Sequence, residues 1–183
     1  MILAPDLINE YLDALVADGD AACKDWADPQ AWVARSCRAL VRAGRREFPV
    51  AEGATKGMKD RYDRSEYLGL DVTLYAPTSW TPPLFVAEHE YWRDAAKVQY
   101  DAWKLLAVEA QRRMLVAYFE KGTSIPSFKK LEELVKEVCK ENPGKDILLV
   151  GADAAADPKG AKELRGIHES AIVGVMPLSG ASH

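Results

Sequence analysis

The second half of the chain alternates strand-like runs with helical runs, and this order limits the folds open to it. A β-prone run begins at Leu84, directly after Pro82 and Pro83. The next run, RDAAKVQYDAWKLLAVEAQ, has no Gly or Pro, so we expect a helix of about 17 residues. Strand, helix and strand follow as RRMLVAYFEKG, SFKKLEELVKEVCKENPG and ILLVGAD. The order predicts an α/β fold with a mixed β-sheet flanked by helices.

The first part of the chain is helical. Apolar residues at helical spacing predict an amphipathic helix over residues 5–17, which Gly19 ends. Asp28 suits an N-cap, and Pro29 suits the first position of a second helix that we expect to reach about Gly44.

Loops and further strands connect these parts. Residues 50–57 turn to Gly, Ala and Thr, which predicts a loop. One or two strands that stop at Pro77 should follow, because the β-prone residues there are Tyr62, Tyr67, Leu68, Leu70, Val72, Leu74 and Tyr75. We expect a loop or short helix over residues 154–166 and a last strand in HESAIVGVMPL.

Length and composition predict one globular domain. The chain has 183 residues, 48% of them hydrophobic and 28% charged. We divide it into a helical N-terminal part (residues 1–48), a core (residues 58–151) and a C-terminal strand region (residues 166–178). The formal net charge of -4 and the pI near 5.5 argue against a surface that binds nucleic acid throughout. Any site for a polyanion must therefore be local.

Several classes of protein and site find no support in the sequence. The start of the chain has no basic leader, and no run approaches the roughly 18 apolar residues of a membrane span. We therefore expect a soluble, cytoplasmic protein without a membrane partner. The three cysteines are widely spaced, which predicts reduced thiols, and the three histidines are too sparse for a zinc site or a Ser-His-Asp triad.

Carboxylates gather on two of the predicted strands. In FVAEHEY, Glu88 and Glu90 are two residues apart and share one face of a strand, while His89 points to the other. Asp71 lies within the preceding apolar run LGLDVTLYA. If the two strands are neighbours, Asp71 and Glu88 can converge on one cation, which would remove the repulsion between them. Oxygen ligands of this kind suit magnesium or manganese.

Two lysines on the following helix face the same way. Lys97 and Lys104 are seven residues apart, which places them within about 20° of each other around the helix axis. Tyr100 and Asp101 lie near that face, and Val98, Ala102 and Leu105 form a neighbouring apolar stripe. A lysine that reaches back over the strand end could orient a water molecule or stabilise charge on a phosphate.

These residues together resemble a known family. Asp71 on one strand, Glu88-His89-Glu90 at the end of the next, and then a helix and another strand are similar to the PD-(D/E)XK nuclease superfamily, the fold of restriction endonucleases. The resemblance covers roughly residues 60–120. It implies a magnesium- or manganese-dependent phosphodiesterase in which Asp71 and Glu88 hold the metal and Glu90 binds it or a water.

The resemblance also raises a question about catalysis. Such enzymes usually carry lysine two positions after Glu88, where this chain has Glu90. Some members take the lysine from the following helix, which would make Lys104, with Lys97 in reserve, the catalytic substitute. Other members have lost catalysis and keep only the fold.

Other residues extend the proposed site. Arg35, Arg38 and Arg42 recur at helical spacing and could follow nucleic-acid phosphates. Trp80, Trp92 and Trp103 surround the site in sequence and could stack on bases, although we expect Trp103 to pack in the core. Either Glu66 or Glu10 could complete the acidic cluster.

Each interpretation has an alternative. The three acids could face solvent at strand ends, and the lysines and arginines could be ordinary solvated charges. The leading hypothesis is a metal-dependent nuclease that acts on DNA or RNA. A second is an inactive endonuclease-like fold that binds a partner, for example as a homodimer. A third is acid–base chemistry on a small molecule without metal.

Overall fold

One mixed β-sheet forms the centre of the molecule. The computed structural model describes residues 4–49, 51–55, 69–77, 82–169 and 172–175. Within these residues the sheet has six strands in chain order: β1 Glu52–Thr55, β2 Val72–Tyr75, β3 Phe85–Glu90, β4 Arg112–Phe119, β5 Ile147–Asp153 and β6 Ile172–Val175. β3, β4 and β5 are parallel to one another, and the remaining pairs are antiparallel. The predicted class, a mixed sheet flanked by helices, is confirmed.

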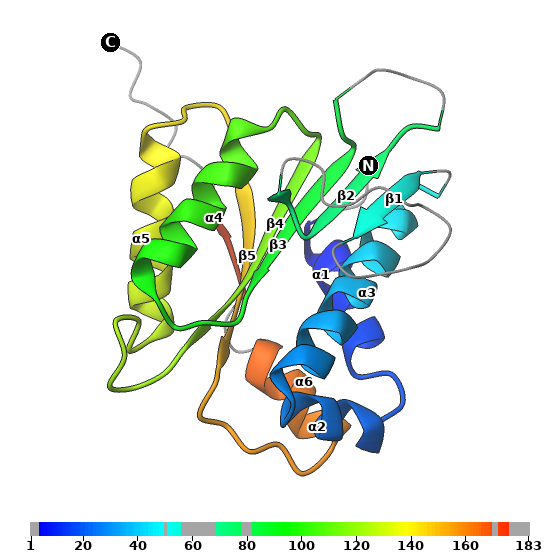
Figure 1. The fold of residues 1–183 in the computed structure, drawn as a ribbon, viewed down its shortest axis with the longest axis vertical. Helices are drawn as coiled ribbons and strands as arrows, with labels where there is room; N and C mark the ends of the chain where they lie inside the picture. The colour runs from blue at the N-terminus through cyan, green and yellow to red at the C-terminus, as the bar shows by residue number, and fades with distance from the viewer. Residues whose placement is uncertain (1–3, 50, 56–68, 78–81, 170–171, 176–183) are drawn as a thin grey trace.

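Helices cover both faces of this sheet (Figure 1). One face is covered by α4 Ala95–Ala107 and α5 Phe128–Lys140, and the other by α1 Ala4–Leu15, α3 Pro29–Glu47 and α6 Ala161–Glu169, with α2 Asp20–Trp26 beside α3 and α6. Side chains alternate between the two layers. Along β3, for example, Phe85 and Ala87 pack toward α1 and α3, whereas Val86 packs toward α4 and α5.

The long helix α3 fixes one side of the sheet. Its N-cap is Asp28, as predicted, whose Oδ1 accepts hydrogen bonds from the backbone N–H groups of Gln30 and Ala31 at 2.9 and 3.3 Å. Near its other end, Gly44 lies so close to the sheet that an added Cβ would be 2.5 Å from Leu74 Cδ1 and 2.9 Å from Phe85 Cδ1. The absence of a side chain at Gly44 therefore lets α3 rest on β2 and β3.

Several predicted boundaries were wrong. Residues 52–55 form strand β1 where we expected a loop, because hydrogen bonds to β2 stabilise an edge strand that composition does not reveal. The sequence analysis also missed α2. The helix α4 has 13 residues and ends at Ala107, where the Arg113 guanidinium donates hydrogen bonds to the carbonyl oxygens of Leu105 and Val108.

The C-terminal strand region also needs correction. We expected the last strand in HESAIVGVMPL, residues 168–178, within a C-terminal strand region of residues 166–178; a strand does form there, but α6 continues to Glu169 and β6 spans Ile172–Val175. Among the predicted strand residues, Tyr62, Tyr67 and Leu68 lie outside the described part of the chain. No helix in the described ranges is both long and apolar enough to cross a membrane.

Candidate active site

The register of β2 and β3 places Asp71 beside the end of β3. Val72 pairs with Ala87 in an antiparallel ladder, so the two strands are neighbours, which is the condition for Asp71 and Glu88 to approach each other. Asp71, directly before β2, accepts a hydrogen bond on Oδ2 from the backbone N–H of His89 at 2.9 Å. Asp71 and Glu88 are both buried and line the same pocket, whose volume is about 380 Å³. The two acids therefore lie at one site, as the sequence predicts.

Lys104 extends from α4 into this cluster of acids. Its Nζ lies 2.6 Å from Glu88 Oε1 and 2.9 Å from Asp101 Oδ1. It also donates a hydrogen bond to the carbonyl oxygen of Gly69 at 3.1 Å. The ammonium group is thus held against the strand end that carries Glu88. Lys97 lines the same pocket but is exposed.

The sequence analysis assigned no role to Asp101. It is buried beside the apolar stripe of α4 and binds Lys104 from one turn away. An acid three residues before a lysine, on the side of the helix that faces the sheet, was the signal that could have identified it. Asp101 brings the number of carboxyl groups that line the pocket to four, with Asp71, Glu88 and Glu90.

Burial and mutual repulsion make these acids hard to ionise. Burial and, after it, the charge of Asp71 raise the pKa of Glu88, and the nearby Lys104 ammonium group opposes this rise only in part, so that the resulting pKa is about 9. Burial likewise raises the pKa of Glu90; the backbone N–H of Trp92 opposes this rise, the neighbouring Asp101 supports it, and the resulting pKa is about 7. The pocket therefore holds more acid than its two lysines neutralise.

The same surroundings keep Lys104 charged. Burial alone would lower the pKa of Lys104, but its close contacts with the carboxyl groups of Glu88 and Asp101 outweigh this effect and raise it. The ammonium group is therefore charged at neutral pH and acts as a fixed cation beside Glu88.

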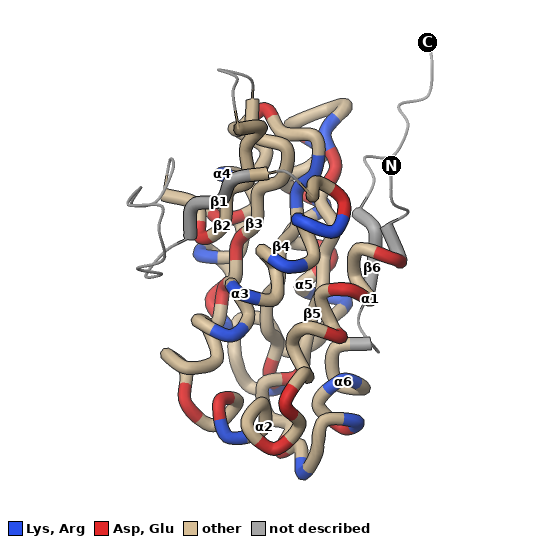
Figure 2. The backbone as a smooth tube through the Cα atoms, turned by 90° about the vertical axis from the view of Figure 1, so that its right-hand side faces the viewer, with Lys and Arg blue, Asp and Glu red and all other residues tan. Residues whose placement is uncertain are grey.

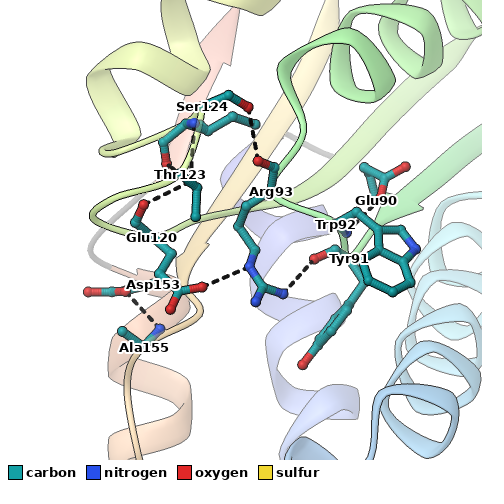
Figure 3. A network of polar contacts seen from close by, with 10 residues as sticks. Glu90, Tyr91, Trp92, Arg93, Glu120, Thr123, Ser124, Asp153 and Ala155 are labelled. Carbon is teal, nitrogen blue, oxygen red and sulfur yellow. Dashed lines mark hydrogen bonds and ion pairs between the residues drawn. The ribbon is translucent and has the colours of Figure 1, made fainter.

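A hydrogen-bond network holds the loop between β3 and α4 (Figure 3). The backbone N–H of Trp92 donates to Glu90 Oε1 at 2.6 Å. The Arg93 guanidinium donates to Glu120 Oε2 at 2.9 Å and to the Tyr91 carbonyl oxygen at 3.4 Å. Ser124 Oγ donates to the Arg93 carbonyl oxygen at 3.0 Å. These bonds connect Glu90 and the loop before α4 to the segment that follows β4.

His89 points to the opposite face, as predicted. Its Nε2 lies 2.9 Å from the Tyr118 hydroxyl, which accepts a hydrogen bond from Trp32 Nε1 at 2.6 Å. Burial and, after it, the nearby His168 lower the pKa of His89 to about 3. His89 is therefore a neutral histidine of the core and is not directed toward the acids.

The predicted nucleic-acid stripe on α3 needs correction at Arg35. Its Nε lies 2.6 Å from Asp25 Oδ2, and its Nη1 donates to the Ala17 carbonyl oxygen at 2.9 Å. Arg35 therefore ties α3 to the preceding elements and is not available for phosphates. Arg38 and Arg42 are exposed on the same helix. Figure 2 shows Lys and Arg segments interspersed with Asp and Glu segments along the described chain.

Two further predictions were wrong. Glu10 pairs with Arg46 at 3.3 Å on the α1–α3 side of the sheet, so it does not join the acidic cluster. Trp103 is 51% exposed, because it lies outside the apolar stripe through which α4 packs. Glu66 and Trp80, which we also considered, fall outside the described residues.

The donor set suits a hard divalent cation, although the described residues contain no group of three or more acids, histidines or cysteines arranged to hold a metal ion. Magnesium commonly binds through one or two carboxylates together with water and substrate phosphate. Asp71 and Glu88 contribute two carboxyl groups of this kind to one pocket. Comparison of the chain with protein-family models, curated proteins and solved structures gave no match.

Proposed function

We propose that this protein is a nuclease-like phosphodiester hydrolase that depends on magnesium or manganese, with a restriction endonuclease-like site. The position of Lys104 is the observation that carries the proposal. The chain has Glu90 where the PD-(D/E)XK pattern has lysine, and Lys104 brings an ammonium group from the following helix to within 2.6 Å of Glu88. The resemblance requires such a substitution for an active site.

Asp71 and Glu88 would hold the cation in this proposal. They lie at adjacent strand ends, and the raised pKa of Glu88 indicates that the pocket has too little positive charge for its acids. A bound divalent cation would supply Lewis-acid stabilisation of the phosphodiester and of the attacking water. Glu90, on the same face of β3, would bind the cation or orient a water.

Lys104 would stabilise negative charge that develops on the phosphate. Its ammonium group is already oriented by Glu88, Asp101 and the Gly69 carbonyl, so little reorganisation accompanies the reaction. Lys97 is exposed at the same pocket and would contact a phosphate of the substrate. Arg38 and Arg42 would contribute contacts only if the nucleic acid also crosses α3.

One observation favours the inactive alternative, in which the fold binds a nucleic acid or a second copy without cleavage. Lys104 Nζ already lies 2.6 Å from Glu88 Oε1 and 2.9 Å from Asp101 Oδ1, so these acids have a cationic partner without metal. On that interpretation Lys104 is a structural substitute for the ion and holds α4 against β3.

A cleavage assay separates the two functions. Purified protein with magnesium or manganese is incubated with plasmid, single-stranded DNA and RNA, beside the variants Asp71→Ala and Lys104→Gln. The exposed Lys97→Gln is the matched lysine control. The hydrolase predicts metal-dependent cleavage that Asp71→Ala abolishes and Lys104→Gln reduces by roughly 100-fold or more, with a smaller loss for Lys97→Gln.

The contrary results are equally specific. Cleavage that survives Asp71→Ala would assign the activity to another site or a contaminant. Absence of both cleavage and manganese binding heat in the wild-type protein would favour the inactive alternative.

A further inference from the structure

Three large apolar side chains are exposed at one place on the described surface. They are Trp92, Tyr100 and Trp103, with exposed fractions of 62%, 59% and 51%. Trp92 lies in the loop before α4, and the other two lie one turn apart on α4. We call these three residues the aromatic ridge. Trp92 and Tyr100 also line the carboxylate pocket, so the ridge borders the candidate active site.

Two rings of the ridge stack on each other, and two cations lie beside its rings. Tyr100 and Trp103 stack with ring centroids 5.8 Å apart and an angle of 24° between their planes. Lys104 Nζ lies 5.3 Å from the Tyr100 ring centroid, and Lys97 Nζ lies 5.0 Å from the Trp92 ring centroid. The surface thus presents aromatic planes and ammonium groups side by side along the edge of the pocket.

This combination matches the chemistry of an unpaired nucleic-acid strand. Every base has a flat face that can stack on an exposed aromatic ring, whatever the sequence, and lysines contact the backbone phosphates. In a duplex those base faces are covered by their neighbours. An aromatic surface therefore gains far more from unpaired than from paired nucleotides.

We infer that the aromatic ridge binds unpaired bases of single-stranded DNA or RNA and leads that strand to the carboxylate pocket. The delivery of a strand for cleavage rests on the proposed hydrolase function, whereas binding by the ridge does not. Trp103 and Tyr100 form the stacking surface on α4, and Trp92 and Lys97 contact the strand at the mouth of the pocket.

The size of the ridge argues against a second copy of the chain as its occupant. Three aromatic side chains of about 200 Å² each, slightly more than half exposed, offer roughly 350 Å². A stable protein interface needs about 800 Å² on each partner. Self-association through the ridge would also cover a charged pocket.

Binding without metal tests the inference independently of cleavage. Fluorescence anisotropy in EDTA compares the affinity of the protein for a labelled single-stranded thymidine oligonucleotide with its affinity for the same oligonucleotide in a duplex. A length of about 12 nucleotides is within the usual range of binding-site sizes for single strands. The variants are Trp103→Ala, Trp103→Phe and Tyr100→Ala, whose side chains are exposed and whose loss spares the core. For charge, Lys97→Ala is matched by Lys129→Ala, an exposed lysine in the first turn of α5.

We expect the wild-type protein to bind the single strand more tightly than the duplex. Trp103→Ala and Tyr100→Ala should each weaken single-strand binding by roughly 5- to 150-fold, the value of one stacked base. Trp103→Phe should retain most of the affinity because it keeps a ring. Lys97→Ala should weaken binding, and Lys129→Ala should leave it unchanged.

Two results would overturn the inference. One is the absence of the expected preference: equal affinity of the wild-type protein for duplex and single strand, or equal affinity of the wild-type protein and the alanine variants for the single strand. The other is a change in the sedimentation of the ridge variants with no change in oligonucleotide affinity, which would assign the ridge to protein association. Ridge-dependent binding without any metal-dependent cleavage supports the ridge and rejects the hydrolase, so the two proposals fail separately.

Discussion

Replacing Glu88 with glutamine should stabilise the protein in the absence of metal. The side chain is buried, and its pKa is about 9 in the folded protein, against 4.5 for an unperturbed glutamate. Between these values the folded protein retains a proton that the unfolded chain releases. The free energy of unfolding therefore falls as pH rises through this window. Glutamine has the same shape and releases no proton in either state, so Glu88→Gln removes this loss.

The size of the effect follows from the width of the window. For each pH unit between the two pKa values, the free energy of unfolding of the wild-type protein falls by about 1.4 kcal/mol relative to that of the variant. At pH 7.5, which is three units above 4.5, the variant should be more stable by up to roughly 4 kcal/mol. Below pH 4.5 the difference should disappear, because the glutamate is then largely protonated in both states. For a chain of this size, roughly 4 kcal/mol at pH 7.5 corresponds to an increase in Tm of about 8–16 °C.

Urea denaturation at pH 5 and pH 7.5, in EDTA, measures the difference directly. Glu133→Gln is the matched control, because Glu133 is exposed on α5 and should show little change between the two pH values. A Glu88→Gln variant that is less stable than wild type at pH 7.5 would refute the reasoning. That result would mean that Glu88 is ionised in the folded protein and that its ion pair with Lys104 outweighs the cost of burial.

Two further predictions concern metal binding at Glu88 and the packing of α3 on the sheet. Manganese affinity should rise with pH between pH 7 and 9, by up to about tenfold per pH unit, because the raised pKa of Glu88 means that the cation must displace a proton from this carboxyl group. Calorimetry in buffers of different ionisation enthalpy should detect the released proton, and a pH-independent affinity would contradict this role of Glu88. Gly44→Ala should destabilise the fold by about 1–3 kcal/mol in thermal denaturation, because its Cβ would be 2.5 Å from Leu74. The control Gly166→Ala, in open space on α6, should be neutral or stabilising, and an equal loss in both variants would show that close packing is not the cause.

The sequence predicted the parts of the fold that depend on local signals. Asp28 and Pro29 mark the start of α3 because capping and a fixed backbone angle act within one helical turn. The face shared by Glu88 and Glu90 follows from the two-residue period of a strand, which also directs His89 to the other face. The same local signals missed β1, whose strand conformation depends on pairing with β2.

Tertiary structure decided which of the two lysines on one side of α4 lies against the acids. Lys97 and Lys104 share one side of α4, so helical periodicity alone does not separate them. The packing of α4 on β3 brings Lys104 to Glu88 and leaves Lys97 exposed beside Trp92. The same packing buries Asp101 next to Lys104 and leaves the side chain of Trp103 exposed to solvent. The sequence by itself determined the order of elements and the acids on the strands, because periodicity and capping are local. Only the folded chain determined the charge balance of the pocket, because repulsion and burial depend on distances between residues far apart in sequence.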